Sequence, residues 1–195
     1  MGDFPPATEA DVAEVEILRA GWGNPETVIL GVDRLDYTKG ILQRLSAFEE
    51  LLETGALDPK KVVLVQIATP SRERIEHYQQ TRSAVEEAVG RINGRFGGIG
   101  KPVVHYSHRS VPKPVLRQYY RLADVLLVTP FKDGMNLVAK EYVACHEDGS
   151  GALVLSEFAG AANELEQAHL CNPFDIESVK SALRQAVVGL RESPE

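Results

Sequence analysis

The sequence predicts an α/β fold in which a Rossmann-like parallel sheet is sandwiched by helices. Short apolar runs rich in β-branched residues alternate with segments whose apolar residues recur at helical spacing. Strands separated by helices of this length pair in parallel through right-handed crossovers, and the helices cover both faces of the sheet. At 195 residues, with 44% hydrophobic and 25% charged residues, the chain suits one globular domain with a substantial core.

Residues 1–8 are polar and contain prolines, so we expect a tail or linker remnant there and a single domain over residues 9–195. Continuous apolar runs are typical of strands that are buried on both faces of a parallel sheet. On this basis strands are expected at residues 27–32, 62–68, 102–106, 124–128 and 152–155, with an edge strand at 169–171.

The expected helices follow from apolar residues at helical spacing and from residues that begin or end a helix. Gly21 and Gly23 end the first helix, a glycine-rich turn around residues 94–100 ends the third, and Asp175 is an N-cap for the last. Helices are expected at residues 9–20, 41–52, 71–92, 113–122, 136–146, 161–167 and 175–190.

Composition argues against several classes of protein. The net charge of −7 leaves no basic excess with which to bind nucleic acid or an anionic membrane surface, so neither is expected as a partner. No apolar run approaches the roughly 20 residues of a membrane span, and no signal segment is apparent. We therefore expect a cytoplasmic protein with two reduced thiols, Cys145 and Cys171. Neither cysteine has partners at metal-binding spacing, nor do His105 and His108, so no metal is expected.

Two strand-to-helix junctions contain the residues that indicate a ligand-binding site. GVDRLDYTKG (residues 31–40) and DGMNLVAKE (residues 133–141) each lie between an apolar run and a helical pattern. In a parallel sheet such junctions face one edge, where the ligands of α/β proteins bind. The planar guanidinium of Arg34 and the compact ammonium charge of Lys39 suit the binding of a diphosphate. A simple surface cluster, in which Arg34 pairs with a neighbouring carboxylate (Asp33 or Asp36), stays open.

The second junction has the properties of an anion site at a helix start. Asn136 is a competent N-cap, and the free amides of Asn136, Leu137 and Val138 would point at a bound anion. Gly134 permits close backbone approach or a positive φ. This half of the site therefore suits the phosphates of a nucleotide.

Two carboxylates at the same junction suit hydroxyl groups. Asp133 can accept hydrogen bonds from a sugar, and Glu141, one turn beyond Leu137 on the same helix face, can accept them from a ribose diol. The alternative, in which Asp133 only caps the helix and Glu141 pairs with Lys140 or solvent, stays open. Together the two junctions predict a site for a nucleotide joined to a sugar.

Five segments resemble the trehalose-6-phosphate synthases, a family of retaining glycosyltransferases (family 20) with the GT-B fold. They are GVDRLDYTKG, IATPSR (67–72), GRINGRFG (90–97), LVTPFKDGMNLVAKEYVA (127–144) and GALVLSEFAGAANEL (151–165). They occur in the family's order and spacing, from about residue 28 to the end. The resemblance covers only the C-terminal, donor-binding half of such an enzyme, and it implies that the N-terminal acceptor domain is absent.

The resemblance also implies a role for individual residues. Arg34 and Lys39 would be the catalytic residues, because they grip the donor diphosphate. Asp133 and the three amides that follow it would hold the transferred glucose, and the next two amides would contact phosphate. The implied donor-binding residues are Arg34, Lys39, Val111, Asp133, Gly134, Met135, Asn136, Leu137, Val138 and Glu141.

Three further roles follow from the same resemblance. Glu141 would bind the ribose, and the backbone of Val111 would meet the nucleobase. Arg72 matches the arginine that reaches the phosphate of the acceptor.

The implied reaction moves glucose from a nucleoside-diphosphate glucose (UDP-, GDP- or ADP-glucose) to glucose-6-phosphate with retention, giving trehalose 6-phosphate. In the family's usual account no protein nucleophile is needed, and the donor's phosphate oxygen helps to deprotonate the acceptor. No metal or cofactor is implied, because cationic side chains and helix amides neutralise the departing diphosphate. Without its N-terminal domain, the chain is expected to bind nucleotide weakly and to show no turnover.

Three other functions stay open on the sequence. A catalytically silent, regulatory synthase-like module should have lost donor-binding residues that this chain retains. A pseudo-glycosyltransferase that couples cyclitols through nitrogen would have a closely similar donor half. A generic nucleotide-binding Rossmann domain would bind without sugar preference. The nucleobase of the donor and the state of the parent enzyme, monomer or homo-oligomer, also stay open.

Overall fold

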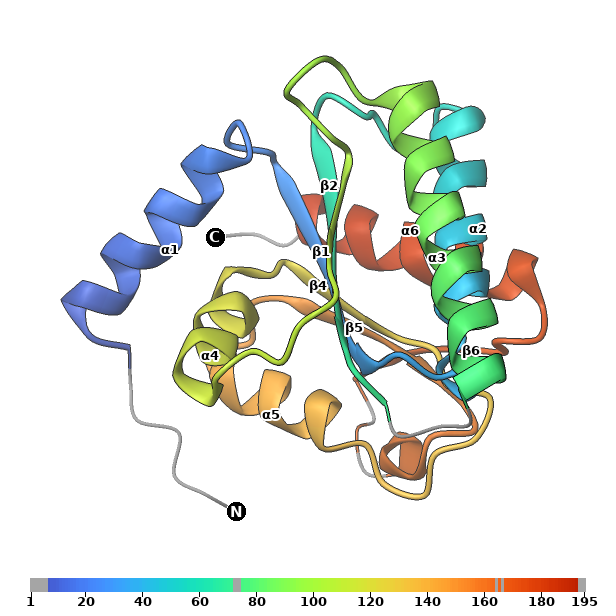
Figure 1. Ribbon diagram of the computed structural model, residues 1–195. Helices are drawn as coiled ribbons and strands as arrows, with labels where there is room; N and C mark the ends of the chain where they lie inside the picture. The colour runs from blue at the N-terminus through green and yellow to red at the C-terminus, as the bar shows by residue number, and fades with distance from the viewer. Residues whose placement is uncertain (1–6, 72–74, 164, 166, 193–195) are drawn as a thin grey trace.

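The computed structural model describes residues 7–71, 75–163, 165 and 167–192, and it shows one sheet with helices on both faces (Figure 1). The six strands are β1 (Thr27–Arg34), β2 (Val62–Thr69), β3 (Val104–Ser107), β4 (Val125–Val128), β5 (Ala152–Ser156) and β6 (His169–Cys171). Their order is β3-β2-β1-β4-β5-β6, and every neighbouring pair is parallel. The predicted α/β fold with a Rossmann-like parallel sheet is confirmed.

The helices form the two outer layers of this sandwich. They are α1 (Glu9–Gly21), α2 (Ile41–Glu53), α3 (Ile75–Phe96), α4 (Lys113–Leu122), α5 (Leu137–Cys145) and α6 (Ile176–Glu192), with short 3-10 helices η1 (Tyr37–Lys39) and η2 (Gly160–Asn163). One apolar cluster lies between the sheet and α2, α3 and α6, and a second lies between the sheet and α4, α5 and α1 (Figure 1).

Strand β1 is one of the two central strands of the sheet and shows why the apolar runs of this sequence become strands. Seven of its eight residues are buried. Because successive side chains point to opposite faces, Ile29 packs into the cluster under α2 while Val28 and Leu30 pack into the cluster under α4 and α5. A strand that must fill both cores has no polar face, which explains the continuous apolar run.

Most predicted bounds agree with the structure within two residues, and the clearest differences concern three elements. The expected strand at 102–106 begins at Val104. The expected helix at 71–92 is described from Ile75 and runs on through Gly94 to Phe96, although a glycine inside a helix costs about 1 kcal/mol. The glycine-rich segment that follows is a turn, as predicted, closed by reciprocal hydrogen bonds between Gly98 and Lys101.

The third difference lies in the segment after β5. Of the helix expected at 161–167, residues 161–163 belong to the 3-10 helix η2, and residues 164 and 166 lie outside the described residues. Its first residue, Gly160, donates its amide to the carbonyl oxygen of Asp133 at 2.8 Å, so the start of the segment is held to another loop.

The strand order places the two predicted junctions together. From β1 the chain proceeds through α2 to β2 and β3, and then crosses back through α4 to β4 on the other side of β1. The carboxyl ends of β1 and β4 therefore flank the point at which the strand order reverses. In open α/β sheets the ligand lies in the crevice at this point.

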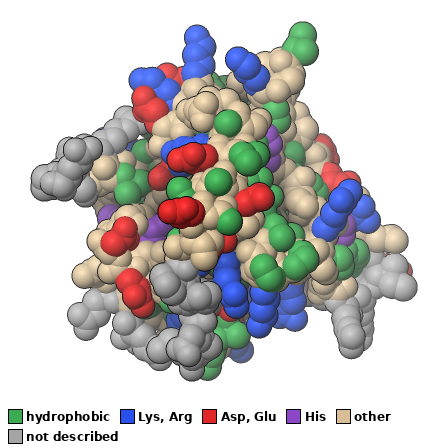
Figure 2. All heavy atoms as spheres, turned by 90° about the vertical axis from the view of Figure 1, so that its left-hand side faces the viewer, with side chains coloured by type: hydrophobic (Ala, Val, Ile, Leu, Met, Phe, Trp, Pro, Cys, Tyr) green, Lys and Arg blue, Asp and Glu red, His purple; other side chains and the backbone are tan. Residues whose placement is uncertain are grey.

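The outer surface matches the composition. Figure 2 views the side of the molecule on which α1 lies in Figure 1, and acidic, basic and apolar side chains are interspersed among the residues it colours. Among the described helices, none has the length and apolar character needed to span a membrane. Thr8 caps α1 through a reciprocal capping box with Asp11.

Candidate functional site

The loops that follow β1 and β4 are joined to each other at the carboxyl edge of the sheet. The amide of Phe131 donates to the carbonyl oxygen of Thr38 at 2.7 Å. Gly40 has φ of +67°, and a Cβ at this position would collide with the carbonyl oxygen of Thr129. Glycine is therefore required twice over, by its backbone conformation and by the close approach of the second loop.

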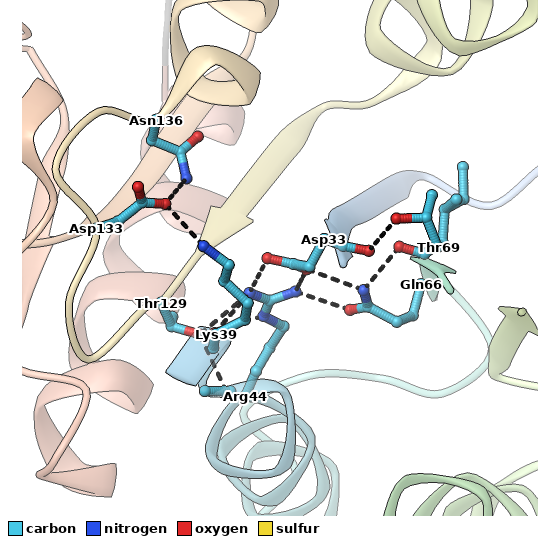
Figure 3. A network of polar contacts seen from close by, with 10 residues as sticks. Asp33, Lys39, Arg44, Gln66, Thr69, Thr129, Asp133 and Asn136 are labelled. Atoms are coloured by element: carbon cyan, nitrogen blue, oxygen red, sulfur yellow. Dashed lines mark hydrogen bonds and ion pairs between the residues drawn. The ribbon is translucent and has the colours of Figure 1, made fainter. Parts of the chain in front are cut away.

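Side chains from the two loops converge on the carboxylate of Asp133 (Figure 3). Lys39 donates from Nζ to Asp133 Oδ2 at 3.1 Å, and Asn136 donates from Nδ2 to the same oxygen at 3.1 Å. The side chains of Lys39 and Asp133 are only 13% and 15% exposed, so this ion pair is largely shielded from water. Both contacts use Oδ2, and Oδ1 accepts no hydrogen bond from the part of the chain that the structure describes.

Asn136 has a second role at the start of α5. Its Oδ1 accepts from the amide of Ala139 at 2.9 Å, which makes it the N-cap of the helix, as predicted. The alternative in which Asp133 caps this helix is wrong. One buried side chain thus fixes both the helix start and the orientation of the Asp133 carboxylate.

Part of the segment 134–138 is exposed to solvent at the same edge. Met135 and Leu137 are each 60% exposed, and the amides of Leu137 and Val138 belong to the first turn of α5, where amides lack partners within the helix. Gly134 has no positive φ, and a Cβ built on it would meet no described atom within 4 Å. The free space above Gly134 allows a ligand to approach this backbone.

A third loop, after β5, supports the second junction from behind. Asp133 forms an isolated parallel bridge with Ala159, next to the hydrogen bond that Gly160 donates to Asp133. A Cβ at Gly160 would collide with the carbonyl oxygen of Gly134. Sequence reasoning missed this contact. The one signal in the sequence is Gly160, which lies in a segment whose other residues favour a helix.

The other predicted residues lie around these loops. Arg34 is the last residue of β1 and is exposed at the same edge, one residue before the loop that carries Lys39. Val111 lies in the loop between β3 and α4 and is partly buried against the apolar cluster of α4 and α5. Arg72 lies outside the described residues.

Glu141 has a partner that sequence reasoning missed. It is partly buried on α5, and its Oε2 accepts a hydrogen bond from the hydroxyl of Tyr120 on α4 at 3.1 Å. The sequence left open a pairing of Glu141 with Lys140 or with solvent, whereas the hydrogen bond found here is with Tyr120. Burial raises the pKa of the Tyr120 hydroxyl far above its usual value, and the adjacent Glu141 carboxylate raises it further, so the phenol stays a donor.

A buried arginine lies directly beneath the two loops. Arg44 on α2 is fully buried and donates to Asp33 Oδ2 at 2.5 Å and to Gln66 Oε1 at 2.8 Å (Figure 3). It also donates to Thr129 Oγ1 at 3.2 Å and to the carbonyl oxygen of Lys39 at 3.5 Å. Asp33 is only 8% exposed, and its carboxylate accepts hydrogen bonds from Arg44 and Gln66. The alternative in which Arg34 pairs with Asp33 at the surface is therefore wrong.

Sequence reasoning missed this network although two signals were present. Arg44 falls on the apolar face of its helix, beside Ile41, Leu45 and Phe48. Gly31 interrupts the apolar run of β1, and a Cβ there would collide with the side chains of Gln66 and Arg44.

The histidines that were considered as metal ligands have structural contacts. His108 Nδ1 lies 3.1 Å from the carbonyl oxygen of Ala68, and its Nε2 lies 2.5 Å from the hydroxyl of Tyr78. His105 packs against the Trp22 ring, and burial lowers its pKa. Over residues 7–71, 75–163, 165 and 167–192, no group of three or more potential ligands could hold a metal ion.

Comparison with known proteins gives consistent matches. The model of a family described as glycosyltransferase family 20 matches residues 7–193. A trehalose-6-phosphate synthase from Mycolicibacterium gilvum (strain PYR-GCK) is 57% identical over 188 residues, which cover 96% of this chain and 37% of the relative. One from Mycobacterium leprae (strain TN) is 58% identical over 175 residues, which cover 90% and 35%.

Solved structures agree with this chain in fold as well as in sequence. An alpha,alpha-trehalose-phosphate synthase (UDP-forming) from Burkholderia xenovorans in complex with glucose-6-phosphate superimposes with a TM-score of 0.84 at 40% identity, over 97% of this chain and 44% of that one. A protein from E. coli, described as trehalose-6-phosphate bound with UDP-2-fluoro glucose, gives 0.83 at 42% identity, over 94% and 40%. The chain therefore spans less than half the length of these relatives.

We predict that Arg44→Met destabilises the protein by about 3–5 kcal/mol, because the carboxylate of Asp33 is left buried without its cation. Urea unfolding measures the loss through the transition midpoint. The double variant Arg44→Met with Asp33→Asn removes the stranded charge and should recover more than half of it. Arg82→Ala, at an exposed ion pair on α3, is the matched control and should change stability by less than about 0.5 kcal/mol. A double variant no more stable than the single one would contradict the prediction.

Proposed function

The chain belongs to glycosyltransferase family 20, and from this premise we propose that the carboxyl edge of its sheet binds a nucleoside-diphosphate glucose. In the parent enzyme, glucose would pass from this donor to glucose-6-phosphate with retention, giving trehalose 6-phosphate. The observation that carries the proposal is the junction of the two loops through Lys39, Asp133 and Asn136 at the switch point of the sheet.

The donor diphosphate would be held by cations from one loop and amides from the other. Lys39 and the exposed Arg34 supply positive charge, and the first-turn amides of Leu137 and Val138 add the positive end of the α5 dipole. Lys39 is already positioned by Asp133, so the diphosphate would compete with this carboxylate for the lysine ammonium.

The glucose would lie over the open backbone that follows Asp133. Its hydroxyls can donate to Asp133 Oδ1, and they can accept from the amides of Gly134, Met135 and Asn136. The absence of described atoms within 4 Å of a Cβ on Gly134 leaves room for the sugar. Glu141 would accept from the ribose, and the backbone of Val111 would contact the base.

Catalysis in this scheme is mainly electrostatic. As the bond between glucose and the diphosphate breaks, negative charge grows on the departing phosphate oxygens. Arg34, Lys39 and the α5 amides are in place before the reaction and stabilise that charge without reorganisation. The donor's own phosphate oxygen would accept the acceptor proton, and Arg72 would bind the acceptor phosphate.

The names of the solved relatives make uridine nucleotides the first ligands to test, since one is described as UDP-forming and another as bound with UDP-2-fluoro glucose. GDP and ADP would be titrated in parallel to establish the nucleobase. UDP alone reports the diphosphate, ribose and base contacts, and UDP-glucose adds the sugar contacts.

We predict that Arg34→Ala weakens UDP binding by roughly 1.5–3 kcal/mol, the range for a hydrogen bond to a charged group. Titration calorimetry of the 195-residue chain measures the change. Arg82→Ala, which removes the same charge from the exposed face of α3, should leave the affinity unchanged. Equal affinities for the wild-type chain and Arg34→Ala would remove this arginine from the site.

We predict that the wild-type chain binds UDP-glucose at least threefold more tightly than UDP, because hydrogen bonds to the sugar contribute about 0.5–1.5 kcal/mol each. In Asp133→Asn, Lys39 loses its ion pair and the sugar loses a charged acceptor, so this preference should shrink. Equal binding of UDP and UDP-glucose by the wild-type chain would favour a generic nucleotide-binding domain.

We predict that the purified 195-residue chain forms no trehalose 6-phosphate from UDP-glucose and glucose-6-phosphate. The expected reason is that it spans about a third of its curated relatives, so most of the acceptor site would lie elsewhere. The full-length Mycolicibacterium gilvum relative serves as the positive control. Product formed by the chain alone would refute this part of the proposal.

A further inference from the structure

Tyr120 lies in an unusually well-fixed position beside the carboxylate assigned to the ribose. It is on α4, is 1% exposed, and donates its hydroxyl to Glu141 Oε2 at 3.1 Å. Two further hydrogen bonds hold α4 against α5. Tyr142 donates to the carbonyl oxygen of Ala123 at 2.9 Å, and His146 Nε2 lies 2.6 Å from the carbonyl oxygen of Tyr120.

The contact leaves half of the Glu141 carboxylate available. Tyr120 engages Oε2, while Oε1 accepts no hydrogen bond from any residue in the described part of the chain. A glutamate side chain has three rotatable bonds, and a buried donor on one oxygen limits the directions in which the other can point. A phenol is protonated at neutral pH even at its ordinary pKa, and burial raises the pKa of Tyr120 further, so the restraint persists.

We propose that Tyr120 is a positioning residue for the donor nucleotide, which fixes the Glu141 carboxylate so that Oε1 faces the ribose diol and favours ribonucleotides over deoxyribonucleotides. The inference rests on the proposed function, because it takes Glu141 as the acceptor for the ribose hydroxyls. Preorganisation of this kind lowers the entropy lost when the ligand binds, and it acts only on ligands that have the hydroxyl groups.

A purely structural role for this hydroxyl can be separated from a positioning role. Tyr142 lies on the neighbouring helix, is 2% exposed and also donates its hydroxyl across the α4–α5 contact, but it donates to a main-chain carbonyl. Removing either hydroxyl leaves a buried acceptor without its donor and should lower stability similarly. Only the loss of the Tyr120 hydroxyl releases Glu141.

The test compares UDP with 2′,3′-dideoxyuridine diphosphate by titration calorimetry of the 195-residue chain. In the wild-type chain the ribonucleotide is expected to bind about tenfold more tightly, the effect of a hydrogen bond to a charged group. Tyr120→Phe should reduce this ratio by at least about threefold, with little change in the affinity for the dideoxy analogue. Tyr142→Phe, the matched control, should keep the wild-type ratio.

The double variant Tyr120→Phe with Glu141→Gln shows whether the two side chains act together. Glu141→Gln alone should bring the ratio close to one, and adding Tyr120→Phe should change it no further. A wild-type ratio in Tyr120→Phe would overturn the positioning role while leaving the proposed function intact. Failure of the wild-type chain to bind UDP at all would overturn both.

Discussion

The buried guanidinium of Arg44 is the interaction on which the candidate site depends. It contacts the ends of β1 and β4 through Asp33 and Thr129, strand β2 through Gln66, and the loop of Lys39 through a carbonyl oxygen. Taking such an ion pair out of water costs several kcal/mol per ion, which its contacts must repay. What the network adds is geometry, because one rigid, five-donor group fixes both loops relative to the sheet.

Above this network, the ion pair of Lys39 and Asp133 fixes the positions of both side chains. Asn136 holds Asp133 from one side, and Gly160 holds its backbone from the other. The lysine is therefore kept close to the start of α5 with little conformational freedom left to lose. A diphosphate that takes over the ammonium would release the Asp133 carboxylate for sugar hydroxyls, which couples the two halves of a nucleotide-sugar ligand.

Much of the fold and part of the site could be predicted from the sequence, because both depend on local patterns. Apolar periodicity indicated the strands and helices, and the two junctions then had to share an edge. The Arg44 network could not be derived in this way, since its partners come from strands β1 and β2, the residue after β4 and the 3-10 helix η1. For the same reason the hydrogen bond from Gly160 to Asp133 could not be predicted, because it joins two loops that the sequence does not place side by side.

Helix α5 shows how a single element can combine contacts that look unrelated in the sequence. Its N-cap orients Asp133, its first amides face the open edge, and Glu141 follows Leu137 by four residues, about 6 Å along the axis. Because a helix is rigid over this length, the groups proposed to bind phosphate and ribose keep a fixed separation. The remaining freedom is the rotation of the Glu141 side chain, and Tyr120 restricts that rotation from a neighbouring helix. Recognition of the donor would therefore depend on the α4–α5 contact as well as on residues that touch the ligand.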